Sequence, residues 1–134
     1  MNKIILPQLL KEQMLEHAAS DPGIEVCGLI GANGRQAFNL YPVKNIAEQP
    51  THNFLMDPEA QVAIMRQLRA KKESLWGIYH SHPDTQAIPS ERDLKLAAYP
   101  GVNYFIISLI HDMPEIKAYV FDGKQFEKLI LEIN

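Results

Sequence analysis

Two histidines separated by one residue, His80 and His82, are the first candidates for chemistry in this sequence. The segment around them is predicted to be a β-strand, in which side chains at positions i and i+2 point to the same face. Trp76 and Ile78 are predicted to share that face. Both imidazoles can therefore converge on one ion, and Pro83 ends the strand because proline cannot donate a ladder hydrogen bond.

A carboxylate follows after a short loop. Ser90 occupies a position typical of a helix N-cap, and Asp93 lies three residues later, in the first turn. Two neutral imidazoles and one carboxylate, with a position left for water, are typical of a catalytic zinc site rather than a closed structural one. Each feature alone has a simpler explanation, because the histidines could be ordinary surface or core residues and Ser90 and Asp93 only a capping pair. Their joint occurrence favours a metal site.

A general base would complete such a site by taking a proton from water. Glu25 is the candidate, since it lies between the apolar residues Ile24 and Val26, where a solvated side chain is poorly accommodated. On periodicity alone, however, the pattern favours a solvent-exposed glutamate at the end of a turn. Cys27, two residues further on, is predicted to be a small buried side chain near the site, because no residue is placed to activate it as a nucleophile.

Composition restricts the possible classes of protein. With 134 residues, 46% hydrophobic and 22% charged, the chain is expected to form one globular domain, residues 1–134. A net charge of −3 gives no general attraction to nucleic acid or to anionic membranes. No apolar run approaches the roughly 20 residues of a membrane span, and the N-terminus lacks the features of a signal peptide. The single cysteine excludes an intrachain disulfide and a Cys-x-x-Cys metal site, so we expect a cytoplasmic protein.

Apolar runs and turn signals predict the strands that position these residues. Asn33-Gly34 is typical of a two-residue hairpin turn and pairs the preceding strand with residues 36–43. Residues 104–110 form a continuous apolar run, which indicates a central strand buried on both faces. Asp122-Gly123 predicts a final hairpin between residues 115–121 and 124–133. The predicted strands are 3–6, 24–30, 36–43, 53–56, 76–82, 104–110, 115–121 and 124–133.

Three helices are predicted around this sheet. The first runs from about residue 7 to 20. The second begins with Asp57 as N-cap and Pro58 at the first helical position, and runs to about residue 72. The third begins at Ser90 and ends before Pro100. Their predicted core-facing residues are Leu10, Met14 and Ala18 in the first, Val62, Met65 and Leu68 in the second, and Leu94, Ala97 and Ala98 in the third. The order of elements indicates one α/β (or α+β) domain with a mixed sheet.

The motif as a whole resembles the JAMM (MPN-plus, Mov34/PAD-1) family of zinc metallopeptidases. That family has an upstream Glu, then His-x-His-Pro, six residues, and Ser-x-x-Asp. This chain has Glu25, His80-Ser81-His82-Pro83, six residues (84–89) and Ser90-Glu91-Arg92-Asp93, so no position departs from the pattern. A weaker similarity covers Asn45-Ile46-Ala47 and Phe54-Leu55-Met56-Asp57-Pro58. The resemblance implies the JAMM/MPN (cytidine-deaminase-like) fold, a mixed, partly barrel-like β-sheet flanked by three helices.

The resemblance also implies a role for each residue of the motif. His80, His82 and Asp93 would hold one zinc ion per chain, and Glu25 would act as the general base. Ser90 would donate a hydrogen bond to the oxyanion or to the attacking water. Ser81, on the opposite face of the strand, would only support the geometry of the site. Because the motif is complete, non-catalytic MPN-minus relatives are a poorer match.

The implied substrate is the C-terminal Gly-Gly tail of ubiquitin or of a ubiquitin-like protein. Small single-domain prokaryotic members are similar to enzymes that trim ubiquitin-like sulfur carriers. One alternative is a non-catalytic, zinc-stabilised module that binds such tails, although an intact Glu25 beside an open ligand set argues against it. Another is hydrolysis of a different amide. Since the predicted loops are short, we expect a tail bound along a sheet edge and cleaved after Gly-Gly, rather than linkage-specific deubiquitination.

Overall fold

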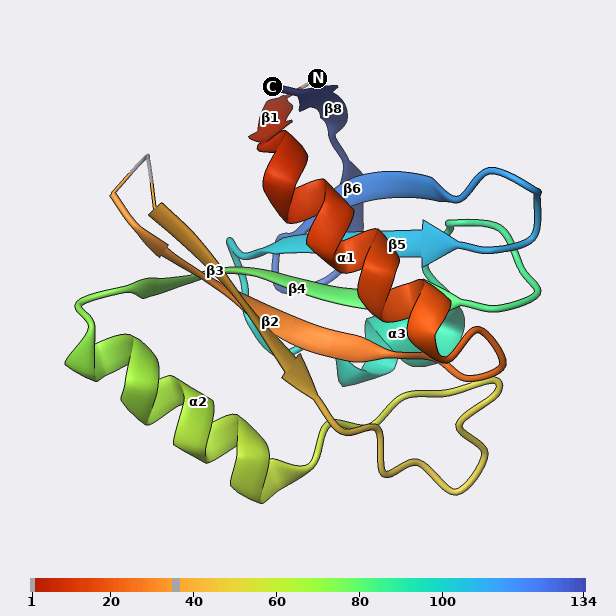
Figure 1. Cartoon of the computed structure of the whole chain (residues 1–134), viewed down its shortest axis with the longest axis horizontal. Coiled ribbons are helices and arrows are strands. Elements are labelled where there is room, and N and C mark those ends of the chain that lie inside the picture. Colours follow the sequence, from red (N-terminus) through yellow and green to blue (C-terminus); the bar gives the residue numbers. More distant parts are fainter. Residues whose placement is uncertain (1, 35–36) are drawn as a thin grey trace.

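A six-stranded mixed sheet forms the centre of the computed structural model, which describes residues 2–34 and 37–134 (Figure 1). Its strands are β2 (Cys27–Asn33), β3 (Ala37–Val43), β4 (Ser74–His82), β5 (Asn103–Ser108), β6 (Glu115–Phe121) and β7 (Phe126–Lys128). They lie in the order β3-β2-β4-β5-β6-β7, with β4 and β5 parallel and the other neighbours antiparallel. Among the described residues, β3 and β7 are the sheet edges. The predicted mixed sheet is therefore confirmed, but it is open and does not close into a barrel.

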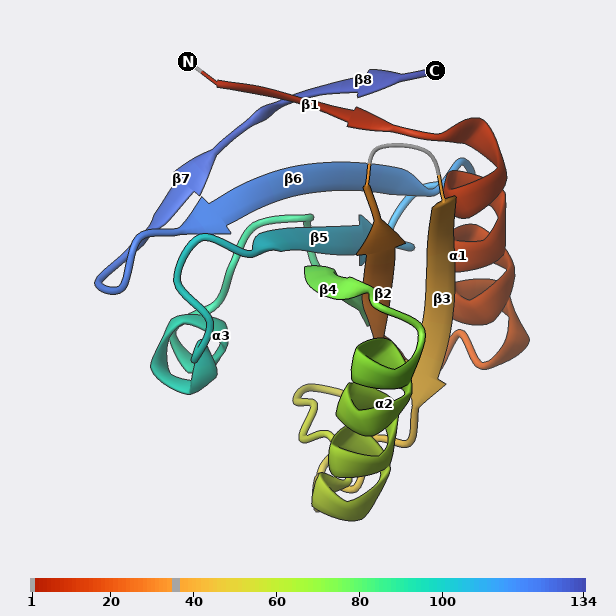
Figure 2. The ribbon, with the colours of Figure 1, turned by 90° about the vertical axis from the view of Figure 1, so that its left-hand side faces the viewer.

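A separate pair of short parallel strands, β1 (Lys3–Leu6) and β8 (Ile130–Ile133), joins the first and the last strand of the chain (Figure 2). The final hairpin around Asp122-Gly123 forms between β6 and β7 as predicted, but its second strand is interrupted. Leu129 is buried, and its N–H still bonds the Ala118 carbonyl of β6 (2.9 Å). The N–H of the next residue, Ile130, donates instead to the backbone carbonyl of Asn2 (2.8 Å). The chain therefore leaves the six-stranded sheet at Ile130.

Helices cover both faces of the sheet. α1 (Gln8–Ser20) buries Leu10, Met14 and Ala18 on one face, as predicted. α2 (Pro58–Ala70) packs on the opposite face through Ile64 and Leu68. α3 (Glu91–Leu96) stands beyond the end of β4 (Figure 1). None of these helices is long and apolar enough to cross a bilayer.

The predicted core-facing residues of the second and third helices need correction. Val62 is 52% exposed, because the stripe of α2 that meets the sheet runs through Ile64 and Leu68. α3 has only six residues, and Leu94 on it is exposed. The helix ends early because Ala97 adopts an extended conformation (φ −66°, ψ 128°). Ala97 is partly buried beyond the helix end, and Ala98 is exposed.

Several predicted strands also differ from the structure or cannot be compared with it. The strand expected at residues 24–30 begins only at Cys27 and continues to Asn33, which lies opposite Ala37 in the hairpin. Gln36, the predicted start of the second hairpin strand, lies outside the described residues. Residues 53–56 form only a single bridge, between Asn45 and Met56, rather than a strand.

A bulge in β4 reverses the predicted orientation of one side chain. Ile30 of β2 lies opposite Gly77, but Gly31 lies opposite Leu75, so Trp76 is the extra residue. Trp76 therefore packs on the α1 face, with Phe105 at 5.5 Å between ring centroids. Ile78, His80 and His82 keep the alternation and share the other face.

Candidate metal centre and active site

The histidine pair lies at the carboxyl end of β4, an interior strand with β2 on one side and β5 on the other. His80 is 2% exposed and His82 is 3% exposed, and their Nε2 atoms are 3.1 Å apart. Cys27 of β2 lies opposite His80 on one side, and Ile106 of β5 lies opposite it on the other. The predicted convergence of the two imidazoles is therefore present in the fold.

Asp93 in the first turn of α3 completes a triangle of donor atoms. Its Oδ2 is 3.2 Å from Nε2 of His80 and 3.2 Å from Nε2 of His82. The same oxygen accepts a hydrogen bond from the backbone N–H of Ser90 (2.9 Å), and Ser90 Oγ accepts one from the N–H of Asp93 (3.0 Å). This is a capping box, and it fixes Asp93 in place. The sequence left two alternatives for Asp93, a role in a capping pair or a role as a metal ligand. In this structure the two roles are compatible.

The spacing of this triangle fits a small tetrahedral cation. Ligand atoms that are each about 2.0–2.1 Å from a tetrahedral ion lie about 3.3 Å from one another. The three donor atoms here are 3.1–3.2 Å apart. Such close packing of three lone-pair-bearing atoms in a buried position would be unfavourable without a cation between them. The residues present therefore fit a metal ion.

The surroundings of His82 favour its role as a ligand through Nε2. Its Nδ1 lies 2.7 Å from the carbonyl oxygen of Gln86. Because a carbonyl can only accept, Nδ1 carries the proton, and in the neutral imidazole Nε2 presents its lone pair to the site. Burial opposes the charged form of His82, but the hydrogen bonds to Asp93 and to the Gln86 carbonyl outweigh it and raise the pKa of this imidazole.

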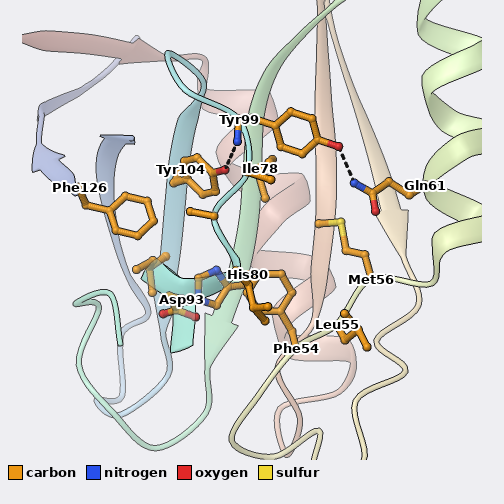
Figure 3. Close-up of a pocket in the computed structure, with 14 residues that line it drawn as sticks. Phe54, Leu55, Met56, Gln61, Ile78, His80, Asp93, Tyr99, Tyr104 and Phe126 are labelled. Carbon is orange, nitrogen blue, oxygen red and sulfur yellow. Dashed lines mark hydrogen bonds and ion pairs between the residues drawn. The ribbon is translucent and has the colours of Figure 1, made fainter. Parts of the chain in front are cut away.

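His80 is held mainly by packing. Its ring stacks on Phe54, with the centroids 4.3 Å apart and the planes 27° from parallel (Figure 3). Its Nδ1 is buried and has no hydrogen-bond partner among the described residues. Burial lowers the pKa of His80, so the neutral form is favoured. Burial alone would raise the pKa of Asp93, but His80 and His82 hold it well below its usual range, so Asp93 is a carboxylate.

Glu25 reaches the same point from the segment before β2. It is only 5% exposed, and donor atoms of Glu25, His80, His82 and Asp93 all lie within 4.8 Å of one another. The solvent-exposed glutamate that periodicity favoured is therefore wrong. Burial raises the pKa of Glu25 to about 7, and its Oε1 has no hydrogen-bond partner among the described residues. A carboxyl group with this pKa can both accept and release a proton near neutral pH.

Backbone contacts hold Glu25 in position, because residues 24–26 lie outside the strand. Ser81, fully buried on the far face of β4, accepts a hydrogen bond from the N–H of Val26 (2.9 Å) and donates one to the carbonyl of Ile24 (3.3 Å). The N–H of Glu25 donates to the carbonyl of Pro50 (2.7 Å). Its own carbonyl accepts from the side chain of Asn45 (2.9 Å).

Sequence reasoning gave no role to Asn45 or Phe54. Both lie in the irregular segment between β3 and α2, where the similarity to the family is weak. The signal that could have identified Asn45 is an amide side chain within a segment that has few ladder hydrogen bonds of its own. Phe54 carried no signal, since its contact with His80 exists only in the folded chain.

Two further residues of the motif region have defined states. Ser90 is exposed, and its Oγ already accepts the cap hydrogen bond, so its hydroxyl proton remains available to a ligand. Cys27 is fully buried, with Sγ 3.4 Å from the Val43 carbonyl oxygen. The predicted burial of Cys27 is therefore confirmed, and burial raises the pKa of this thiol to about 12, which favours its neutral form.

One family of known proteins matches most of this chain. The model of the family described as prokaryotic homologs of the JAB domain matches residues 7–122. The chain belongs to this family. The JAMM/MPN membership predicted from the motif is thereby confirmed, and the fold with it.

The named relatives of this JAB-domain chain include a desampylase and a peptidase. It is 33% identical over 121 residues to a desampylase of Haloferax volcanii, covering 89% of this chain and 85% of the relative. It is 34% identical over 101 residues to the CysO-cysteine peptidase of Mycobacterium tuberculosis, covering 74% and 68%. The solution structure of a Desulfitobacterium hafniense protein superimposes with a TM-score of 0.84 at 30% identity, over 98% of this chain and 93% of that one. The JAB-domain chain is accordingly a hydrolase of the JAMM type.

Proposed function

We propose that the chain is a zinc-dependent peptidase or isopeptidase that hydrolyses an amide bond at the C-terminal Gly-Gly tail of a ubiquitin-like, sulfur-carrier-type protein. The cluster of Glu25, His80, His82 and Asp93 within 4.8 Å is the observation that supports it most directly. The relative named as a CysO-cysteine peptidase supports the class of substrate.

Zinc is the metal that this set of donors suits best. His80, His82 and Asp93 would hold one ion per chain, with two nitrogens and one oxygen, whereas Mg²⁺ and Ca²⁺ prefer oxygen ligands only. A bound zinc ion lowers the pKa of a coordinated water to about 7 and polarises a carbonyl group. The triangle of donor atoms leaves one side open toward Glu25, as a catalytic site requires.

The chain's own residues then account for the proton transfers. Glu25, with a pKa near 7, accepts a proton from the attacking water and returns it to the leaving amine. Ser90 donates its free hydroxyl proton to the oxygen on which negative charge develops, a contribution commonly worth about 3 kcal/mol. Asp93 and Gln86 keep the two imidazoles in the orientation and tautomer that this chemistry requires.

We propose a route for the tail other than the sheet edge expected from the sequence. β4 is bonded to β2 on one side and β5 on the other, so there is no free sheet edge beside His80 and His82. Two segments at the end of β4, residues 44–57 and 83–90, lie beside the site that a tail must reach, and their residues Phe54 and Gln86 contact the two histidines. We propose that these segments, rather than a sheet edge, bind the backbone of the tail.

A competition assay tests the proposed function. The substrates are a carrier with a Gly-Gly-x tail, the same carrier with the penultimate glycine changed to alanine, and a lysine-linked diubiquitin. We expect the first to be cleaved fastest, because the buried metal-centre residues leave little room for a side chain beside the scissile bond. Faster cleavage of diubiquitin, or equal cleavage of the glycine and alanine tails, would contradict the proposal.

A further inference from the structure

An apolar cavity of about 200 Å³ opens next to the metal centre (Figure 3). His80 and Asp93 form part of its wall, so whatever occupies it lies next to the metal centre. Other residues of the wall include Phe54 and Leu55 before α2, Leu96 and Ala98 at and after the end of α3, and Tyr104 and Phe126 from β5 and β7.

The rim of the cavity exposes apolar surface. Leu55 is 42% exposed and Leu96 is 45% exposed, although both are large aliphatic residues. Apolar surface gathered around a hollow, beside a buried polar site, indicates a place where a ligand is bound rather than a gap in the core. The volume is below the roughly 300–1,000 Å³ of pockets that enclose a whole small molecule, so it suits a single side chain.

The lining carries no charge other than the metal-centre residues. Its remaining polar side chains are Gln61, Tyr99 and Tyr104, and their polar groups are already engaged (Figure 3). Gln61 Nε2 donates to the Tyr99 hydroxyl (2.9 Å), and the Tyr104 hydroxyl accepts from the backbone N–H of Tyr99 (3.3 Å). The leaving amine of the proposed reaction belongs either to a lysine side chain, which becomes charged on release, or to a free amino acid, which also carries a carboxylate. The cavity offers no charged partner for either, so the apolar, acyl side of the substrate suits it better.

Glycine restricts which residue of the tail can reach the cavity. The two glycines before the scissile bond have no side chain to place in it. The first available side chain belongs to the residue before them, about 7 Å upstream in an extended chain at roughly 3.3 Å per residue.

We propose that this cavity binds an apolar side chain of the carrier tail, immediately upstream of the two glycines, and selects substrates by it. This inference rests on the proposed function. It adds that the enzyme reads a leucine-sized residue in the tail as well as the glycines. Loss of methylene groups from a ligand that fills such a pocket commonly costs 10- to 200-fold in kcat/KM, so the effect is measurable.

The test compares two substrates, a carrier ending in Leu-Gly-Gly-x and the same carrier ending in Ala-Gly-Gly-x. We expect the zinc-loaded wild-type protein to prefer the leucine tail by about 10-fold or more in kcat/KM. Ala98→Leu places a larger side chain at the cavity wall, and we expect it to reduce this preference to within about 3-fold. Leu55→Ala widens the rim and should also weaken the preference. Ala19→Leu makes the same change as Ala98→Leu at an exposed position of α1, and it should retain the full preference.

The possible outcomes separate the two proposals. If the wild-type protein cleaves neither tail while holding zinc, the proposed function is wrong. If it cleaves both tails equally well, or if Ala98→Leu and Leu55→Ala both keep the wild-type preference, the cavity does not read the tail and this inference is wrong. Circular dichroism of each variant confirms that a changed preference belongs to a folded protein.

Discussion

The side-chain amide of Asn45 donates a hydrogen bond of 2.9 Å to the backbone carbonyl of Glu25. The same side chain donates to the carbonyl of Asn53 (2.9 Å) and accepts from the N–H groups of Ala47 (3.0 Å) and Leu55 (2.9 Å). One residue thus ties the base to the segment that carries Phe54, which stacks on His80. We infer that Asn45 is a positioning residue for both the base and a metal ligand.

Asn45→Asp tests this role. The carboxylate can still accept from the N–H groups of Ala47 and Leu55. Its second oxygen, however, replaces the amide that donated to the carbonyls of Glu25 and Asn53, and it repels them. We therefore expect kcat to fall at least 10-fold. We also expect a loss of about 1–3 kcal/mol in the free energy of unfolding, since two buried carbonyls lose their donor. Zinc content should remain close to that of the wild type.

Asn103→Asp is the matched control. Asn103 also donates to a backbone carbonyl, that of Trp76 (2.9 Å), but at the other end of β5 from the metal centre. It should lose stability without a change in kcat. Equal kcat for the wild type and Asn45→Asp, or equal losses of kcat in both variants, would show that Asn45 has no particular role at the site.

Removal of a metal ligand is expected to release the metal. His82→Ala and Asp93→Ala each take one corner from the triangle of donors, so each should lose most of the roughly one zinc per chain expected of the wild type. His52→Ala, at an exposed histidine outside the cluster, should retain it. Metal analysis of the purified proteins measures this. Full zinc in both ligand variants would place the metal elsewhere.

Replacement of the base should abolish hydrolysis and leave the metal in place. In Glu25→Gln the amide is nearly isosteric with the carboxylate but cannot accept the proton, so we expect kcat to fall by about 10²- to 10⁴-fold. Zinc content and the circular dichroism spectrum should match those of the wild type. Activity within a few-fold of the wild type would assign the base to another residue.

The pH dependence of stability gives a separate test of the burial of Glu25. Its pKa is raised from 4.5 to about 7 in the folded protein, so folding disfavours the carboxylate form. In metal-free protein, stability is therefore lost as the pH rises from about 4.5 to 7, by up to about 3 kcal/mol. Glu25→Gln should lack this loss and be more stable than the wild type above pH 7. Urea unfolding at pH 4.5 and pH 8 in the presence of a chelator measures it, and equal pH dependence of the two proteins would contradict it.

The sequence predicted the residues of the site better than the elements that hold them. His80, His82 and Asp93 could be identified because strand periodicity and a cap signal depend on local spacing. The bulge at Trp76 could not, since it depends on the register between β2 and β4. Likewise, Leu129 interrupts the last strand because the ends of the chain pair with each other, and nothing near residue 129 indicates that pairing.

The burial of Glu25 shows the same limit. Local pattern favoured an exposed glutamate, and only contacts with Pro50, Asn45 and Ser81, each distant in the sequence, bring it into the interior. The family motif placed Glu25 in the site without a physical explanation. The structure supplies that explanation through these long-range contacts. Functional residues held by long-range contacts against their local preference are therefore the ones that sequence reasoning alone misplaces.

Ser90 is predicted to have two separable roles, in the cap of α3 and at the oxyanion. Ser90→Ala removes both the acceptor for the Asp93 N–H and the free hydroxyl proton. We expect a loss of about 1 kcal/mol in stability from the cap and about a 10²-fold or greater fall in kcat from the lost donor. Ser90→Thr keeps a hydroxyl that can cap the helix and donate, so its kcat should stay far closer to that of the wild type. Chemical denaturation and kcat of the zinc-loaded proteins separate the two effects. A stability loss in Ser90→Ala with unchanged kcat would reduce Ser90 to a cap, and an equal fall of kcat in both variants would show that the hydroxyl is not the group that matters.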